Sequence, residues 1–134
     1  MSFAIGFVDL AGNAGTAVTA TTAASAVSFD KTAPTLGVVQ IAAPGTDTSK
    51  AKVGDLVTLS FTASKALQQS PTCTFKSGNA SVSGSATTTD GGDNDAATWS
   101  CAYTAQSTDT AGNVSFVIGF VDLAGNAGTA VTAT

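Results

Sequence analysis

The sequence predicts an all-β fold, a two-layer sandwich of about seven antiparallel strands with an additional β segment at its N-terminus. Three observations lead to this prediction. Apolar and polar residues alternate in several short segments, which is the periodicity of strands that bury one face. Thr, Ser, Gly and Asn supply most of the polar positions, and these residues are poor helix formers. Turn-forming residues (Gly, Pro, Asn and Asp) separate the alternating segments.

The N-terminal β segment is predicted from a duplication. Residues 2–21 read SFAIGFVDLAGNAGTAVTAT, and residues 115–134 read SFVIGFVDLAGNAGTAVTAT, so the two copies differ only at Ala4 and Val117. The second copy starts 113 positions after the first. This duplication is typical of a tandem array, in which the tail of one repeat precedes a whole repeat. Alternatively, the first copy fills in a neighbouring molecule the place that its twin could fill.

A domain boundary follows the first copy. The Thr-, Ala- and Ser-rich stretch 22–28 is interpreted as a linker or a continuing edge strand. Pro34 then fixes its own φ, keeps Ala33 extended and removes a backbone donor, so the chain enters the next element without pairing there. We therefore divide the chain into an N-terminal segment, 1–28, and a sandwich domain, 29–134.

The strands of the sandwich domain are predicted at intervals of about eight to twelve residues. The clearest alternation places Val57, Leu59 and Phe61 on one face. The weakest is a polar strand around Val82, and the sequence TTTDGGDND at 87–95 is predicted to be a loop. The predicted strands are 37–42, 52–64, 72–76, 79–86, 97–105, 114–121 and 129–134. This spacing is the pattern of an immunoglobulin-like sandwich.

The charge of the chain excludes several functional classes. Its nine acidic residues are all Asp, its five basic residues are all Lys, and its net charge is −4. This balance argues against nucleic-acid binding, which needs clustered cations. Because His, Glu and Arg are absent, no acid–base pair stands out, and we expect no enzymatic activity. No apolar run approaches the roughly 18 residues that cross a membrane.

The two cysteines are predicted to form a buried disulfide near Trp99. Cys73 and Cys101 both lie in alternating strands, on the face that carries the large apolar residues. The chain has no His to activate a thiolate, and two Cys alone make a poor metal site, although reduced core thiols remain an alternative. A disulfide here would close a loop of about 28 residues and stabilise the fold by about 3 kcal/mol. It would also indicate an extracellular location.

The duplicated segment predicts an assembly strand. Three apolar side chains of the first copy repeat the inward pattern of three in the second. They are Phe3, Ile5 and Phe7 in the first copy and Phe116, Ile118 and Phe120 in the second. Leaving three such side chains in water forgoes about 1.5–3 kcal/mol each. We therefore expect 3–8 to be an ordered β-strand docked on another copy of the chain, giving a filament, unless it is only the tail of a preceding repeat.

Three sequence features carry a resemblance to a known family. They are DKTAP at Asp30–Pro34, Trp99 in a late strand, and DLAGN at Asp122–Asn126 before the last strand. Over residues 29–134 the chain resembles the bacterial Ig-like tandem repeats of large surface adhesins and extracellular fibre proteins. The resemblance implies a structural repeat unit at the cell surface, acting by domain stacking or strand donation. The alternative is a ligand- or glycan-binding adhesion module that uses loops such as 87–95.

Calcium is the possible cofactor. Asp90, Asp93 and Asp95 form the densest carboxylate cluster, and oxygen ligands suit Ca²⁺, although a solvated hairpin loop is the alternative. The resemblance implies a second site at the repeat junction, formed by Asp30 with either Asp122 or Asp109. The alternative there is that the Asp of each D-x-A-G-N turn accepts hydrogen bonds from its own turn.

Two glycosylation sequons are also present, at Asn79 and Asn113. In a chain this rich in Ser and Thr such triplets arise readily, so they do not by themselves indicate a modified protein.

Overall fold

The computed structural model describes residues 2–82, 87–90 and 98–133. The chain forms two compact units, Met1–Lys31 and Thr32–Thr134. All the regular secondary structure of the described residues is β-strand.

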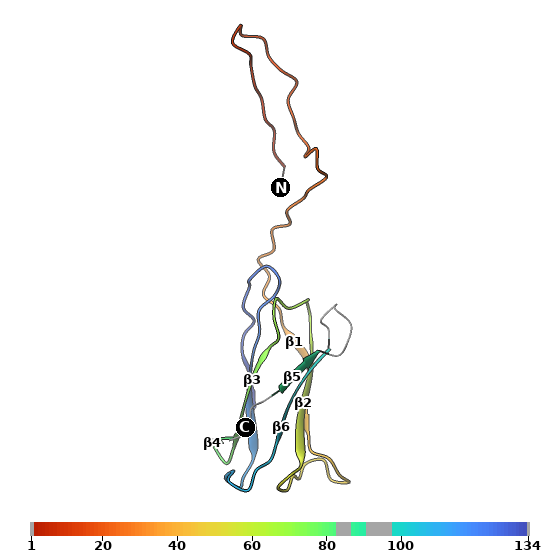
Figure 1. Cartoon of the computed structure of the whole chain (residues 1–134), viewed down its shortest axis with the longest axis vertical. Helices are drawn as coiled ribbons and strands as arrows, with labels where there is room; N and C mark the ends of the chain where they lie inside the picture. The colour runs from red at the N-terminus through yellow and green to blue at the C-terminus, as the bar shows by residue number, and fades with distance from the viewer. Residues whose placement is uncertain (1, 83–86, 91–97, 134) are drawn as a thin grey trace. The chain divides into compact units, whose positions relative to one another are not determined.

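The second unit is a sandwich of two four-stranded antiparallel sheets (Figure 1). One sheet has the order β1-β2-β6-β5 and the other the order β4-β3-β7-β8. The strands are β1 (Leu36–Ala42), β2 (Leu56–Ala63), β3 (Thr72–Ser77), β4 (Ala80–Ser81), β5 (Thr87–Asp90), β6 (Thr98–Thr104), β7 (Val114–Gly119) and β8 (Val131–Ala133). The predicted all-β, two-sheet fold is therefore confirmed.

The core lies between the sheets, where the alternating apolar residues meet. In the first sheet β2 and β6 bury their inward residues in register, with Leu59 opposite Cys101 and Phe61 opposite Trp99. The second sheet contributes Phe75 of β3, whose ring centroid lies 5.0 Å from that of Tyr103. Each strand has one apolar face, so each sheet covers the apolar face of the other. The buried apolar cluster is Val57, Leu59, Phe61, Leu67, Phe75, Trp99, Cys101, Tyr103, Phe116, Ile118 and Phe120.

The largest differences from the predicted strands lie at residue 52 and in the segment 87–95, and the strand predicted at 79–86 corresponds to β4, Ala80–Ser81. The segment predicted to begin a strand at residue 52 first makes a turn, in which Lys52 N–H donates to Oδ2 of Asp55 at 2.9 Å, and β2 begins at Leu56. Part of the predicted loop 87–95 is strand β5, which pairs with β6. Its sequence, TTTD, has no apolar alternation, so the sequence does not predict that this segment pairs with β6.

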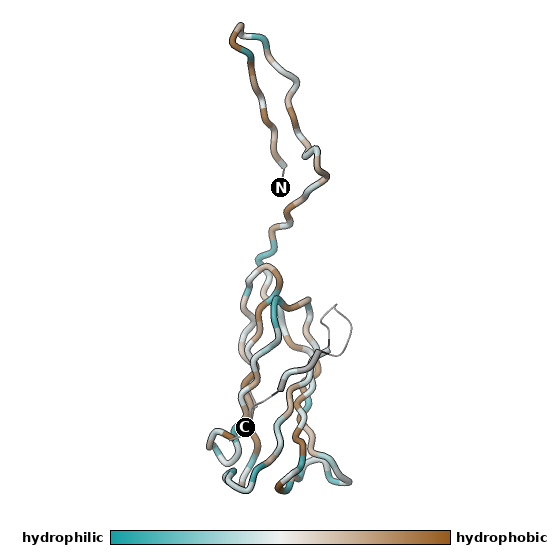
Figure 2. The backbone as a smooth tube through the Cα atoms, viewed as in Figure 1, coloured by the Kyte–Doolittle hydropathy of each residue, from teal (hydrophilic) through white to brown (hydrophobic). Residues whose placement is uncertain are grey.

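The first unit contains a hairpin whose 3–8 arm forms isolated bridges and not a continuous strand in the single chain, while the docking of this arm on another copy stays a prediction. Only two isolated bridges join its arms, Ile5 with Val18 and Val8 with Ala14. The physical reason is that this arm pairs along one edge only, whereas β7 pairs with both β3 and β8. Hydrophobic residues recur along the hairpin and at its tip (Figure 2).

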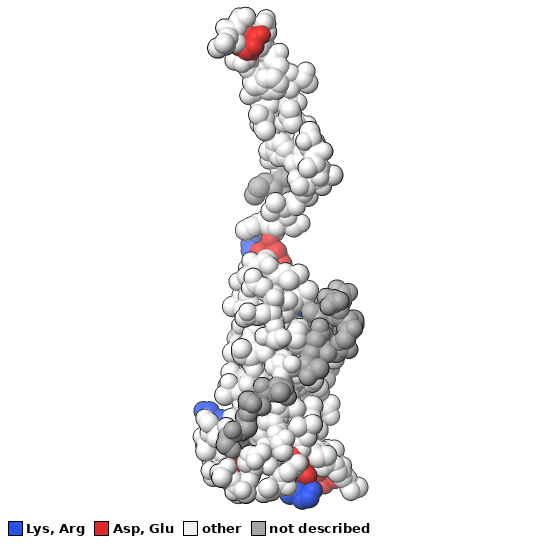
Figure 3. All heavy atoms as spheres, in the orientation of Figure 1, with Lys and Arg blue, Asp and Glu red and all other residues white. Residues whose placement is uncertain are grey.

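The surface of the protein carries few charges. Figure 3 shows a few small groups of Asp and Lys side chains on an otherwise neutral face. None of the described residues forms a helix long and apolar enough to cross a membrane.

Candidate functional site

The disulfide predicted from the sequence is present. It joins Cys73 of β3 to Cys101 of β6, with a Cα–Cα distance of 6.3 Å, and so connects the two sheets. Cys101 is fully buried and Cys73 is half-buried. The hydroxyl of Thr88 lies 3.5 Å from Sγ of Cys101. Both cysteines of the chain are therefore used to hold the sandwich together, and neither is a free thiol.

The hairpin between β7 and β8 is closed by Asp122. One carboxylate oxygen, Oδ1, accepts hydrogen bonds from the N–H groups of Ala124 at 3.0 Å and Asn126 at 2.8 Å. The other, Oδ2, accepts from the Asn126 side-chain amide at 3.1 Å. Gly125, with φ of 89°, supplies the left-handed residue that the turn requires. The Asp of this D-x-A-G-N motif thus organises its own turn.

The turn of the N-terminal hairpin has the same hydrogen bonds, made by Asp9 in place of Asp122. Oδ1 of Asp9 accepts from the N–H groups of Ala11 at 2.9 Å and Asn13 at 2.8 Å, and Oδ2 accepts from the Asn13 amide at 2.8 Å. Gly12, like its twin, has φ of 89°. The isolated bridge between Val8 and Ala14 likewise has a counterpart between the two residues 113 positions later. The conformation of each hairpin is therefore specified by its own twenty residues.

A Phe–Gly contact recurs in both hairpins. The ring of Phe120 lies across Gly128, and a Cβ on that glycine would be 2.1 Å from the nearest ring atom. The ring of Phe7 lies across Gly15 with the same 2.1 Å. The glycine of each pair also donates its N–H to the carbonyl of the Phe, at 3.0 Å and 2.8 Å. The aromatic ring thus covers the glycine backbone of the facing arm, a contact that fixes hairpin register.

The two hairpins differ in their surroundings. The three inward side chains of the C-terminal hairpin are almost fully buried, whereas their twins are about half exposed. Relative exposures are 6% for Phe116, 0% for Ile118 and 6% for Phe120, against 45% for Phe3, 55% for Ile5 and 55% for Phe7. The six predicted assembly residues therefore divide into three that complete the core and three with an uncovered apolar face.

The C-terminal hairpin is covered by a surface that we call the receptor face. It consists of β3, the segment 65–68 after β2, and the core side chains behind them. Phe116 and Ile118 lie opposite Phe75 and Cys73 of β3. Beyond the end of β7, the Gln68 N–H donates to the carbonyl of Val121 at 2.9 Å. The receptor face thus contacts β7 and its continuation along their whole length.

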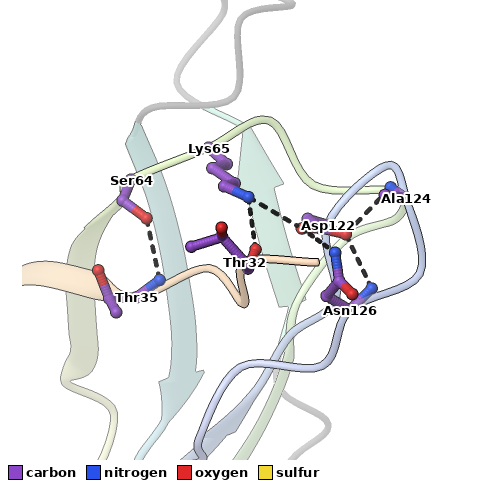
Figure 4. A network of polar contacts seen from close by, with 7 residues as sticks. All are labelled: Thr32, Thr35, Ser64, Lys65, Asp122, Ala124 and Asn126. Carbon is purple, nitrogen blue, oxygen red and sulfur yellow. Dashed lines mark hydrogen bonds and ion pairs between the residues drawn. The ribbon is translucent and has the colours of Figure 1, made fainter. Parts of the chain in front are cut away.

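A lysine completes the receptor face. Nζ of Lys65 lies 3.5 Å from Oδ2 of Asp122 and also donates to the backbone carbonyl of Thr32 (Figure 4). Beside it, the Thr35 N–H donates to Oγ of Ser64 at 2.9 Å, and the Ser64 N–H donates to the Thr35 carbonyl at 2.9 Å. The entry of the chain into the sandwich is therefore fixed against the same end as the hairpin turn.

The environment of Asp122 favours its ionised form. Desolvation by burial raises the pKa of this carboxyl group, but the hydrogen bonds from Asn126 and Ala124 and the charge of Lys65 together lower it by more. The net pKa lies below the ordinary value of 3.8. Asp9 has a lowered pKa as well, chiefly because of its hydrogen bond from the Asn13 side chain. Sequence reasoning did not identify Lys65, although a carboxylate at the end of the most apolar strand was a signal that a cation would face it.

The candidate calcium ligands are not assembled into a site within the described residues. Among those residues no three Asp, Glu, His or Cys side chains lie close enough together to hold a metal ion. Asp30 is exposed in the first unit, Asp90 belongs to β5, and both Asp93 and Asp95 lie outside the described residues.

The two acids proposed as partners of Asp30 at the repeat junction each act locally. Asp109 precedes β7 and accepts a hydrogen bond from the Gln106 N–H at 2.8 Å. Asp122 follows β7, so the strand separates the two carboxylates, and each caps its own loop. Both sequon residues, Asn79 and Asn113, are exposed.

A cavity of about 860 Å³ opens between the sheets, where the loop between β6 and β7 lies. Its wall includes Ile41, Lys52, Val57, Tyr103, Asp109 and Val114. Burial raises the pKa of the Tyr103 phenol, and the nearby Asp109 carboxylate raises it further, while a hydrogen bond with Ser77 opposes the shift. The cavity thus has a mixed wall, in which aliphatic side chains and the Tyr103 phenol lie beside charged and hydroxyl groups such as those of Lys52, Asp109 and Ser49.

No protein-family model, curated protein or solved structure matches this chain.

Proposed function

We propose that the chain is a structural repeat unit of an extracellular surface adhesin or self-assembling fibre. The observation that carries the proposal is the N-terminal hairpin. It has the same turn, bridges and Phe–Gly contact as the C-terminal hairpin, but its apolar face is uncovered. The tail of a preceding repeat would have these properties, because it would keep the fold of its hairpin but lack the sheet that covers its apolar face.

Three further features support a spacer role. The strand orders β1-β2-β6-β5 and β4-β3-β7-β8 correspond to the A-B-E-D and C-F-G sheets of immunoglobulin-type sandwiches, with β4 as an additional edge strand. The inter-sheet disulfide is compatible with an oxidising, extracellular environment. Lys65, Ser64 and the buried Pro34 hold the entry segment in one position, which would limit bending at a junction between repeats.

Hydrogen exchange of the N-terminal hairpin tests the proposal. The Ile5 N–H donates to the Val18 carbonyl at 2.9 Å, and the Val18 N–H donates to the Ile5 carbonyl at 3.0 Å. Within the described residues, no sheet covers this hairpin. Placing residues 22–114 directly before Ser2 would supply the preceding sandwich, with Ile5 where Ile118 normally lies. We expect the Ile5 and Val18 amides to become as protected as those of Ile118 and Val131. The Ile118 amide serves as the internal control. Unchanged exchange at Ile5 would contradict the tandem-array function.

The cavity beside Tyr103 is the observation that favours the alternative, a ligand- or glycan-binding module. That function would require a ligand to enter the cavity. Chemical-shift changes at Tyr103 and Val57 on addition of mono- and disaccharides would support the binding function. The absence of such changes at millimolar sugar would contradict it, and the structural function would remain.

A further inference from the structure

We propose that the receptor face also accepts the 2–21 hairpin of a second copy of the chain, in place of the resident β7–β8 hairpin. Asp9 of the incoming hairpin then takes the position of Asp122 beside Lys65. This inference rests on the proposed function, because it lets separate chains form the junction that a covalent array would form.

The surface that would enter the receptor face is the same in both hairpins. The single difference between the copies, Ala4 against Val117, lies on the outer side of the hairpin. Val117 is 39% exposed and lies opposite Thr74 of β3 and Thr132 of β8. The inward residues and the turn residues are identical. The receptor face therefore cannot distinguish the two hairpins by any contact that it makes with their inner sides.

The incoming hairpin is already in the conformation that it needs. The carboxylate of Asp9 holds the turn, and the Phe7 ring covers Gly15, as in the docked hairpin. Docking therefore pays little for ordering the hairpin. It would bury three half-exposed apolar side chains and place the Asp9 carboxylate beside an ammonium group that already binds such a carboxylate.

The numbers of hairpins and receptor faces limit how far this exchange proceeds. The chain has two copies of this hairpin and, among its described residues, one receptor face, so replacing one copy by the other leaves the same apolar area uncovered. The resident hairpin also has the advantage of a direct connection through β6. In the unaltered chain the two arrangements therefore bury similar apolar area, and the direct connection favours the resident hairpin. Exchange becomes favourable when the resident hairpin is weakened and the N-terminal one is not.

The two isoleucines provide this imbalance in the full-length chain. Ile118 is fully buried, and Ile5 is its twin. Ile118→Ala weakens the resident hairpin and leaves the incoming hairpin intact, whereas Ile5→Ala does the reverse. The two variants have the same composition and weaken different hairpins, so a specific cross-link between the 2–21 hairpin and β3 that increases only with Ile118→Ala reports occupation of the receptor face by the incoming hairpin.

A cysteine pair detects the exchange. In the resident arrangement Thr74 lies opposite Val117, so an incoming hairpin would place Ala4 opposite Thr74. Ala4→Cys with Thr74→Cys should therefore form a cross-link between chains when the exchange occurs. We expect at least about tenfold more covalent dimer and larger species with Ile118→Ala than with Ile5→Ala. Ala17→Cys with Thr74→Cys is the matched control, because residue 17 lies on the arm that does not face β3.

Two outcomes would overturn the proposal. One is equal dimer formation in the Ile118→Ala and Ile5→Ala backgrounds, and the other is cross-linking confined within single chains, shown by mixing chains of two sizes. If Ile118→Ala prevents folding, as judged by loss of the buried Trp99 fluorescence, Ile118→Val provides the milder imbalance. A negative result here together with a protected Ile5 amide in the longer chain would remove hairpin exchange and leave the tandem-array function standing.

Discussion

Nζ of Lys65 lies 3.5 Å from Oδ2 of Asp122, whose side chain is only 2% exposed. The pair joins the segment after β2 in one sheet to the turn between β7 and β8 in the other. It therefore holds the last hairpin to the rest of the sandwich at the end where the chain enters. Asp9 makes the same turn contacts in an exposed hairpin, so the two aspartates form a natural matched pair.

The first prediction compares Asp122→Asn with Asp9→Asn. The amide nitrogen that Asp122→Asn introduces would face the donors of Lys65 and Asn126, so the ion pair and one hydrogen bond are lost at a buried position. We expect the midpoint of thermal unfolding to fall by roughly 5 °C or more. Asp9→Asn should leave the midpoint of the sandwich unchanged. Calorimetry of both variants makes the comparison, and an equal effect of the two would contradict it.

The second prediction concerns acid. The pKa of Asp122 is lower in the folded protein than its ordinary value of 3.8, so its ionised form stabilises the fold. That contribution is complete above about pH 4 and is lost as the pH falls through the lowered pKa. Urea unfolding between pH 2 and 6 should therefore show stability decreasing below about pH 4, with a shallower slope for Asp122→Asn. A variant with the unaltered slope would show that other carboxylates cause the decrease.

The third prediction concerns the disulfide. Cys73 and Cys101 are 28 positions apart, and a cross-link of that span restricts the unfolded chain by about 3–4 kcal/mol. Cys73→Ser with Cys101→Ser should lower the free energy of unfolding by about that amount. The unaltered protein, unfolded without reductant, should show no free thiol. Thiol detected under those conditions would mean that the bond is incomplete.

The fourth prediction concerns the Phe–Gly contact. A Cβ at Gly128 would meet the Phe120 ring at 2.1 Å, so Gly128→Ala must displace a buried aromatic side chain. We expect the sandwich to lose about 1–3 kcal/mol of unfolding free energy. Gly15→Ala makes the same clash with Phe7 in the N-terminal hairpin and should leave the main transition in place. Denaturant unfolding followed by Trp99 fluorescence separates the two cases.

The parts of the fold that the sequence predicts well are those in which one strand carries its own signal. The alternation of Val57, Leu59 and Phe61 located β2, and a similar pattern located β7. Strand β5 was predicted as a loop, because Thr87–Asp90 has no apolar alternation and becomes a strand only by pairing with β6. The two cysteines were paired correctly because both lay on an inward face.

The candidate site was only half predictable for the same reason. The duplication identified both hairpins and their six inward side chains. It did not identify the receptor face, whose Lys65 is distant in sequence from Asp122 and meets it only through the packing of the two sheets. In the single chain residues 3–8 form isolated bridges and not a strand ladder, because an arm that pairs on one edge lacks the second neighbour that β7 has.

The position of the disulfide has a mechanical consequence. If tension is applied to the two ends of the chain, the Cys73–Cys101 bond transmits it directly from β3 to β6. The 27 residues between them, which include β4 and β5, lie in a closed loop that carries none of the load. Substitutions at exposed positions of that loop, such as Asn79 and Ala80, would therefore leave the strand path that carries tension intact, whereas Phe75 and Trp99 in the same loop belong to the core.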